Sequence, residues 1–455
     1  MDIERDLAAY VSNARFEDFP QEAIEVVKYQ VLGVLGTAIA GAKQDGCEPL
    51  VAKVKDWGGK EEASLFLHNG RVPVFNAVFA NSLMARALDF DDAIAPGVHV
   101  GACTVPSAIA VSECLGGQSG KAFLTAVALG AEIAGRLNLE EWQYDGWDPT
   151  GFCGTFGVAA VASKLKGLDE TKTLHALGLA FTRGAGSLQS NIDGALSARL
   201  IQGFASREGI ICAELAEDGI TGPVNFVEGV WGYVHLYGKD NGKTLVGNKN
   251  LGKQFELMKT MFKKYPSCFS TCGSTDLALG LVRKIEAKPE EIEHIDVQIT
   301  PYMFNMVGHP FEIGSTPRVN AQFSVRYCIA NALLRGQPKL KQFELSEISD
   351  PGIMPLIEKI SVSADPALDK IRHTAARMEI RMKDGKVFRK EVDRASGFPG
   401  NPLKKEDHAV RFWDCIDYAS EYYPRENGDK ILEFVNNLER VENVRDVIPL
   451  LQTKT

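Results

Sequence analysis

Apolar residues recur at helical spacing through most of the first 264 positions. Between positions 76 and 240 they form runs rich in alanine, glycine and leucine, and each run ends at a glycine or a charged turn. The clearest runs are TVPSAIAVSECLG, KAFLTAVALGAEIAGRLN, TFGVAAVASKLKG and TKTLHALGLAFTRGAG. Such runs are typical of buried helices that pack closely where small residues meet. We therefore predict a helical domain over residues 1–264, with a short hairpin at Asn69-Gly70.

The hydrophobic pattern changes to an alternation of apolar and polar residues after position 290. The segments HIDVQIT, KISVSAD, ARMEIRM and KVFRKEV have the period of half-buried strands, and QFSVRYCIANALLRG between them has the period of a helix. Asp384-Gly385 marks a hairpin between the last two strands. This pattern predicts an α+β domain over residues 265–395. Helical spacing returns over residues 396–455, which we expect to pack on the first helical region, so the fold class is mainly α with an α+β second domain.

Composition and charge narrow the class of protein. The 455 residues include 45% hydrophobic and 24% charged residues, and the net charge is −9, so a nucleic-acid partner is not expected. The start of the chain lacks a basic segment followed by an apolar one, so a secretion signal is not expected. Polar residues or glycine interrupt the apolar runs before 18 residues, so a membrane partner is not expected. The nine cysteines form no CxxC pair, which favours reduced thiols and a cytoplasmic location.

The stretch 87–106, ALDFDDAIAPGVHVGACTVP, combines acidic residues with a histidine. Asp89, Asp91 and Asp92 precede His99, and an apolar run of helical character follows. Carboxylates and an imidazole at the junction of a loop and a core helix suit proton transfer. The alternative is that the aspartates only cap a helix.

Three further stretches carry candidate groups. Tyr144 and Asp148 lie in a glycine-rich loop before a helix, where an anion can bind, although an ordinary capped helix start has the same pattern. Lys263 lies at the junction of the two predicted domains, where it can pair with a substrate carboxylate. Arg199 and Gln202 are long polar residues within an otherwise apolar helical stretch.

No motif for a nucleotide, a serine nucleophile or a metal ion is present. The chain lacks GxxxxGK[ST], GxGxxG in a strand–helix context, GxSxG and HExxH. An enzyme without a cofactor, or a protein that is not an enzyme, remains.

Six stretches together resemble the MmgE/PrpD family, which includes 2-methylcitrate dehydratase, cis-aconitate decarboxylase and iminodisuccinate epimerase. These are ALDFDD followed by His99, GWDPTGFCGTFGVAAVASKLKGLD at 146–169, ARLIQGFASREGI at 198–210, KKYPSC at 263–268, NAQFSVRYCIANALLRG at 320–336 and RASGFPGNPL at 394–403. The resemblance implies a large helical domain built from both chain ends and a smaller α+β lid. It also implies a homodimer that acts on a small molecule and needs neither a metal nor an organic cofactor.

The resemblance also assigns residues. Asp89, His99 and Lys263 match residues of the family pattern. At five other positions the chain departs from that pattern, with Ala93, Asp148, Ala198, Ile201 and Cys268 in place of a threonine, a histidine, a lysine and two further histidines. Asp148, Ala198 and Ile201 replace groups that can be cationic or donate protons to carboxylates, and each such charge-assisted bond contributes about 1.5–3 kcal/mol. We therefore expect a substrate other than 2-methylcitrate or cis-aconitate.

The resemblance implies a cofactor-independent lyase, a dehydratase or decarboxylase, that moves protons on a small organic acid or carbonyl compound. We expect His99 to be the general base or acid, with its protonation set by Asp89 or Asp92. Asp148 is expected as a second acid–base group and Lys263 as the group that stabilises enolate charge. The expected substrate contacts are Asp92, Tyr144, Arg199, Gln202 and Cys268. The alternatives are an epimerase of the iminodisuccinate epimerase type and an inactive homologue with a binding role.

Overall fold

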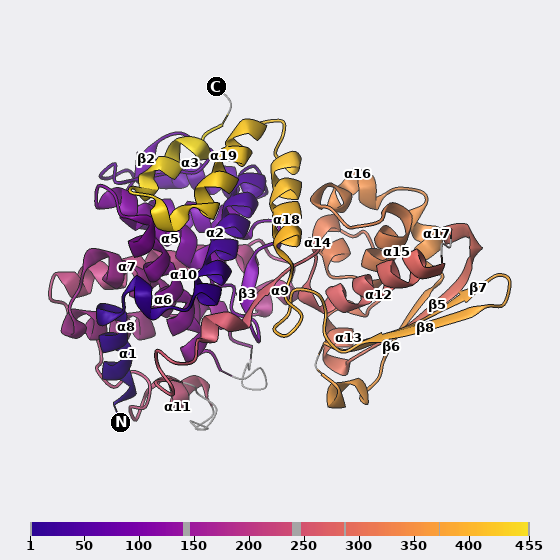
Figure 1. Ribbon diagram of the computed structural model, residues 1–455, viewed down its shortest axis with the longest axis horizontal. Coiled ribbons are helices and arrows are strands. Elements are labelled where there is room, and N and C mark those ends of the chain that lie inside the picture. Colours follow the sequence, from indigo (N-terminus) through magenta and orange to yellow (C-terminus); the bar gives the residue numbers. More distant parts are fainter. Residues whose placement is uncertain (1, 140–145, 239–246, 286–287, 373, 454–455) are drawn as a thin grey trace. The chain divides into compact units, whose positions relative to one another are not determined.

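The computed structural model describes residues 2–139, 146–238, 247–285, 288–372 and 374–453. The chain divides into two compact units (Figure 1). Unit 1 comprises Met1–Met261 and Cys415–Thr455, and unit 2 comprises Phe262–Asp414. The predicted fold class, mainly α with an α+β second domain, is confirmed.

Unit 1 is a bundle of helices that also contains short strands of two or three residues. Its helices are α1 (Ile3–Asn13), α2 (Gln21–Gly41), α3 (Cys47–Trp57), α4 (Val74–Arg86), α5 (Gly101–Cys114), α6 (Gly120–Leu137), α7 (Pro149–Lys166), α8 (Glu170–Arg183), α9 (Gln189–Ile192), α10 (Ser197–Glu217), α11 (Tyr233–Tyr237) and α19 (Arg425–Asn436). Its strands are β1 (Ala63–Ser64), β2 (Arg71–Val72) and β3 (Asp92–Ile94), which pairs with β4 (Thr260–Phe262). β1 and β2 form the antiparallel hairpin predicted at Asn69-Gly70.

Helix α7 lies at the centre of unit 1, where it packs against α5, α6, α8 and α10. The crossing with α6 depends on two glycines. A Cβ atom on Gly157 would lie 2.7 Å from the carbonyl oxygen of Gly130, so a larger residue would push the helices apart. The prediction that small residues occupy the helix crossings is confirmed here.

Helix α2 is the described helix that is long and apolar enough to cross a membrane by length and composition. In the structure 78% of its most apolar window is buried inside the protein, as is typical of a core helix. Figure 1 shows the C-terminal helix α19 beside α2. Lys28 on α2 donates to the carbonyl oxygen of Asn436 at 2.7 Å and pairs with Glu439 at 3.0 Å, so both ends of the chain build unit 1.

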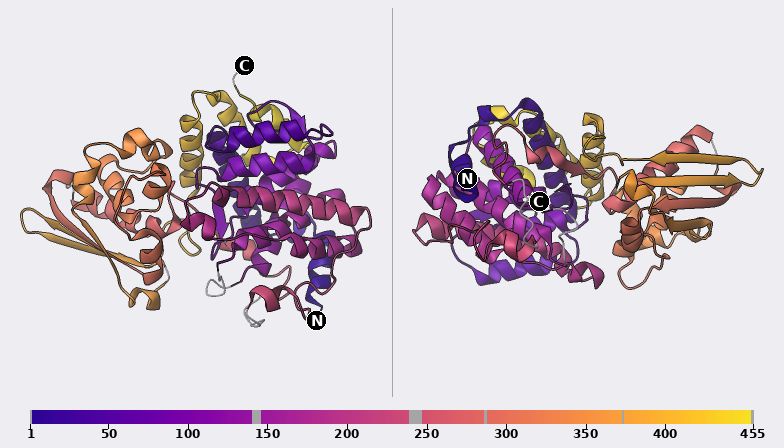
Figure 2. Two further views of the ribbon diagram at one scale, coloured as in Figure 1. Left: turned by 180° about the vertical axis from the view of Figure 1, so that it is seen from behind. Right: turned by 90° about the horizontal axis from the view of Figure 1, so that it is seen from below.

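Unit 2 has a four-stranded sheet with helices on one face (Figures 1 and 2). The strand order is β6-β5-β7-β8, with β5 parallel to β6 and antiparallel to β7. The elements are α12 (Phe269–Ile285), β5 (Ile292–Ile299), α13 (Pro301–Val307), α14 (Pro317–Gln322), α15 (Val325–Arg335), α16 (Leu345–Ile348), α17 (Ile353–Ile357), β6 (Ile360–Ala364), β7 (Ala376–Met382) and β8 (Val387–Val392). Alternate residues of β5 and β7 are buried against the helices. The predicted strands and the hairpin at Asp384-Gly385 are confirmed.

The boundaries between the units fall at residues 261/262 and 414/415 of the sequence, whereas the sequence prediction placed them at 264 and 395. The second difference has a physical reason, because contacts within unit 2 hold the residues after 395. The carbonyl oxygen of Gly397 accepts from the backbone N–H of Phe262 at 3.0 Å. The side chain of Asp414 accepts from the backbone N–H of Leu340, also at 3.0 Å. Helix α18 (Lys405–Tyr418) therefore begins in unit 2 and ends in unit 1.

Candidate active site

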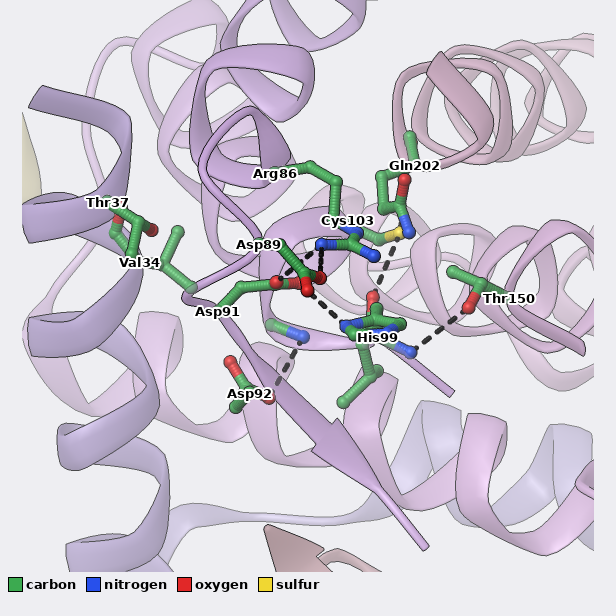
Figure 3. A network of polar contacts seen from close by, with 12 residues as sticks. Val34, Thr37, Arg86, Asp89, Asp91, Asp92, His99, Cys103, Thr150 and Gln202 are labelled. Atoms are coloured by element: carbon green, nitrogen blue, oxygen red, sulfur yellow. Dashed lines mark hydrogen bonds and ion pairs between the residues drawn. The ribbon is translucent and has the colours of Figure 1, made fainter. Parts of the chain in front are cut away.

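The acidic residues predicted as a site gather at the sharp turn between α4 and β3 in unit 1 (Figure 3). Arg86 is the last residue of α4, and its carbonyl oxygen accepts from the backbone N–H of Asp89 at 3.0 Å. Asp89 has a φ of +53°, a left-handed conformation that aspartate tolerates better than most residues. The turn directs the side chains of Asp89 and Asp91 toward the same arginine.

Arg86 pairs with two carboxylates at once. Its Nη1 atom donates to Oδ1 of Asp89 and lies 3.3 Å from Oδ1 of Asp91. The side chains of Asp89 and Asp91 are buried. Although burial acts in the opposite direction, the charges of Asp89 and then Asp91 raise the pKa of Arg86 above its ordinary value, so the guanidinium stays charged.

His99 contacts the second oxygen of Asp91. Its Nδ1 atom lies 3.0 Å from Oδ2 of Asp91, and its backbone N–H donates to Oγ1 of Thr150 at 3.1 Å. The imidazole is 18% exposed, whereas the Asp91 side chain is fully buried. A histidine held by a buried carboxylate and still reached by solvent is suited to proton transfer.

Asp92 faces away from Arg86 and anchors the start of α5. Its Oδ2 atom accepts from Nε2 of Gln30 at 2.9 Å and from the backbone N–H of Gly101 at 3.2 Å. A Cβ atom on Gly101 would lie 1.9 Å from Oδ1 of Asp92, so this contact requires glycine. Burial, with the charge of Asp91 adding to it, raises the pKa of Asp92 to about 6. Its position agrees with the alternative interpretation of an acid that caps a helix.

Asp148 is the N-cap residue of α7. Its Oδ1 atom accepts from the backbone N–H of Thr150 at 2.8 Å, and the side chain is buried. Asp148 is close enough to Arg86 that its charge contributes to the raised pKa of the arginine. Thr150 thus connects the capped end of α7 to the backbone of His99. We call Arg86, Asp89, Asp91, Asp92, His99 and Asp148 the His99 cluster.

Gln202 approaches the same region from α10. Its side chain is 2% exposed, and its Oε1 atom has no hydrogen-bond partner among the described residues. Figure 3 shows the side chain reaching toward Cys103. The Cys103 thiol donates to the carbonyl oxygens of His99 and Gln202, and burial raises the pKa of Cys103 far above its ordinary value. Cys103 is therefore a packing residue and not a thiolate nucleophile.

The remaining predicted site residues are described by their own surroundings, and one of them falls outside the described residues. Arg199 is half-buried. Burial of the Cys47 thiol raises the pKa of Cys47, and Arg199 is close enough for its charge to act in the opposite direction. Lys263 and Cys268 belong to unit 2. The Lys263 ammonium lies 5.0 Å from the centroid of the Phe269 ring, and both Lys263 and Cys268 are buried. Tyr144 falls outside the described residues.

Sequence reasoning missed two features of the site. It named Asp89 or Asp92 as the neighbour of His99, but the imidazole contacts Asp91. It also did not single out Arg86, which holds the two aspartates. The available signal was a lone arginine at the end of an apolar helical run, FNAVFANSLMARAL, directly before three acids.

Comparisons with known proteins identify the family. The model of the MmgE/PrpD N-terminal domain matches residues 5–245, and that of the MmgE/PrpD C-terminal domain matches residues 265–440. A cis-aconitate decarboxylase-like protein of Aspergillus oryzae is 24% identical, with 99% of this chain and 97% of the relative covered. The cis-aconitate decarboxylase of Homo sapiens is 27% identical, over 84% of this chain and 80% of the relative. The 2-methylcitrate dehydratase of Escherichia coli is 22% identical, over 96% and 94%. These relatives are named as a decarboxylase-like protein, a decarboxylase and a dehydratase. The chain belongs to the MmgE/PrpD family.

Proposed function

We propose that this protein is a lyase that moves a proton at a carbon next to a carboxylate or carbonyl group of a small organic molecule. The observation that carries the proposal is the contact of 3.0 Å between His99 and the buried Asp91, with the imidazole still partly exposed. The decarboxylase and dehydratase relatives support the reaction class.

His99 supplies the acid–base step in either reaction. In a decarboxylation the bond to the carboxylate breaks, CO2 leaves, and the electron pair left on the carbon takes a proton from protonated His99. In a dehydration neutral His99 removes the proton next to the carbonyl or carboxylate, and the protonated His99 then gives that proton to the hydroxyl, which leaves as water. General acid–base groups of this kind contribute about 10²–10⁴-fold to the rate. The expectation that Lys263 stabilises enolate charge comes from the family resemblance alone.

The charge of the His99 cluster supports a substrate with few carboxylates. The cluster holds four aspartates and one arginine, and the arginine already pairs with Asp89 and Asp91. Asp148, at the position of a family histidine, uses its Oδ1 atom to cap α7. A second anion beside these carboxylates is repelled, since like charges a few ångströms apart in a partly buried site interact by several kcal/mol. We propose a mono-acid or a carbonyl compound in place of 2-methylcitrate or cis-aconitate.

Proton NMR in D2O tests the reaction. The purified protein is incubated with small hydroxy, keto and unsaturated mono-, di- and tricarboxylates. Deuterium incorporation at one carbon, together with loss of water or CO2, is expected for a monocarboxylate or carbonyl compound. The His99→Gln variant should lose this activity. The His294→Gln variant is a matched control, because His294 also contacts an aspartate, Asp296, but in an exposed position in unit 2.

The outcomes separate the alternatives. Exchange without net product would make the protein an epimerase and contradict the lyase proposal. Robust turnover of 2-methylcitrate or cis-aconitate would contradict the proposed substrate class. An absence of exchange across the whole panel would contradict the acid–base function and favour a binding role.

A further inference from the structure

We infer that Asp91 is a positioning residue that keeps a proton on Nδ1 of His99 and so makes Nε2 the nitrogen that exchanges protons with the substrate. The structural half of this inference, the tautomer, stands by itself. The catalytic half rests on the proposed function.

The contacts of His99 fix both its backbone and its ring. The backbone N–H donates to Oγ1 of Thr150, and Nδ1 lies 3.0 Å from Oδ2 of Asp91. An ionised carboxylate only accepts hydrogen bonds, so Nδ1 must be the donor in this contact. In a neutral imidazole the other nitrogen then carries the lone pair. Nε2 is therefore left as the basic atom of the ring.

Arg86 explains why Asp91 acts as an acceptor although it is fully buried. A buried carboxylate without a partner takes up a proton instead of remaining charged. The guanidinium of Arg86 lies 3.3 Å from Oδ1 of Asp91, while Oδ2 faces His99. The positive charge beside Oδ1 favours the ionised form of Asp91, and Oδ2 is the oxygen that accepts from His99. A carboxylate that accepts from Nδ1 of an acid–base histidine orients the ring as well as setting its tautomer.

The tautomer of His99 can be measured directly, without a substrate. Protein labelled with ¹⁵N only in histidine gives separate shifts for a protonated nitrogen and for one with a lone pair. The signals of His99 are identified by their loss in the His99→Gln variant. At a pH where the His99 ring is neutral, we expect the wild type to have a protonated Nδ1 and an unprotonated Nε2.

The Asp91→Asn variant should change this state, because asparagine can present an N–H to Nδ1 and favour the tautomer protonated on Nε2. The matched control is Asp92→Asn. Asp92 is the neighbouring buried aspartate, but its hydrogen bonds go to Gln30 and Gly101, so the His99 tautomer should stay as in the wild type. Circular dichroism and thermal unfolding check that both variants fold.

Two results would overturn the tautomer assignment. One is a wild-type His99 whose neutral ring is protonated on Nε2, a measurement that does not use Asp91→Asn and so survives a failure of that variant to fold. The other is a folded Asp91→Asn variant whose His99 signals match those of the wild type.

The catalytic half is tested with whichever compound of the D2O panel exchanges. We expect Asp91→Asn to lower kcat at least ~10-fold, because the wrong tautomer leaves no lone pair on Nε2, with KM within a few-fold of the wild type. A folded variant with a switched tautomer and unchanged kcat would overturn the positioning role. If no compound exchanges even with the wild type, the proposed function fails. The ¹⁵N measurement still decides the tautomer, because it needs no substrate.

Discussion

Arg136 and Arg86 of unit 1 both pair with buried carboxylates, but their surroundings differ, and the difference distinguishes a structural ion pair from a candidate functional site. Arg136 on α6 pairs with Glu132 one turn away, with 2.6 Å between Nε and Oε1, and both side chains are fully buried. Its Nη1 and Nη2 atoms donate to the carbonyl oxygens of Gly247, Lys249 and Gln254. Glu132 in turn accepts from the backbone N–H of Leu257 at 3.0 Å. One cation meets one anion, and backbone groups satisfy the remaining atoms.

Arg86 has a less complete environment. A single nitrogen, Nη1, faces both Asp89 and Asp91, and Nε has no hydrogen-bond partner among the described residues. Carboxylates outnumber cations in the His99 cluster, and His99 connects it to solvent. A structural ion pair is neutral and closed, whereas a cluster with surplus charge, incomplete hydrogen bonding and an accessible titratable group is typical of a functional site.

The largest expected effect breaks the structural pair. Arg136→Met leaves the Glu132 carboxylate buried without its cation, which should lower the free energy of unfolding by about 3–5 kcal/mol. The double variant Arg136→Met with Glu132→Leu should recover part of this loss, because no charge remains buried. Urea unfolding followed by circular dichroism measures both. A loss below about 1 kcal/mol in the single variant would show that the pair is not the structural anchor described above.

The next effect separates function from stability within the His99 cluster. His99→Ala should lower the rate at least ~100-fold, about 2.7 kcal/mol in activation free energy. The free energy of unfolding should change by less than about 1 kcal/mol, because the side chain is partly exposed and its backbone contact to Thr150 remains. Rates of deuterium exchange and urea unfolding are compared for the same preparation. A fully active, folded variant would remove His99 from the mechanism.

The sequence alone predicts the elements well and the contacts of the site only in part. The alternation of apolar and polar residues identified all four strands of the unit 2 sheet, and Asp384-Gly385 marked its hairpin, because these signals are local. The choice of Asp91 as the partner of His99 is not local. It depends on the left-handed conformation of Asp89 and on the packing of Asp92 against Gly101, neither of which is visible in a run of three acids.

A third effect uses pH to distinguish Asp92 from the other acids of the cluster. Its pKa is raised from 3.8 to about 6 in the folded state, so the folded protein binds more protons than the unfolded one between these values. The stability that this proton contributes is present below about pH 4 and lost as the pH rises through about 6. Between about pH 4.5 and 6.5 the wild type should therefore lose about 2 kcal/mol relative to Asp92→Asn. Urea midpoints of both proteins across this range measure the difference, and parallel curves would contradict the assignment.

The smallest effect concerns an ion pair between an arginine and a glutamate at the surface. Arg183 lies 2.7 Å from Glu208, but its side chain is 58% exposed, so water already solvates both charges. Arg183→Gln should cost less than about 1 kcal/mol, and the difference from the wild type should shrink further in high salt. Urea unfolding at low and high ionic strength provides the test. A loss as large as that of Arg136→Met would mean that burial is not what distinguishes these arginines, and the contrast between the closed pair and the His99 cluster would then need another physical basis.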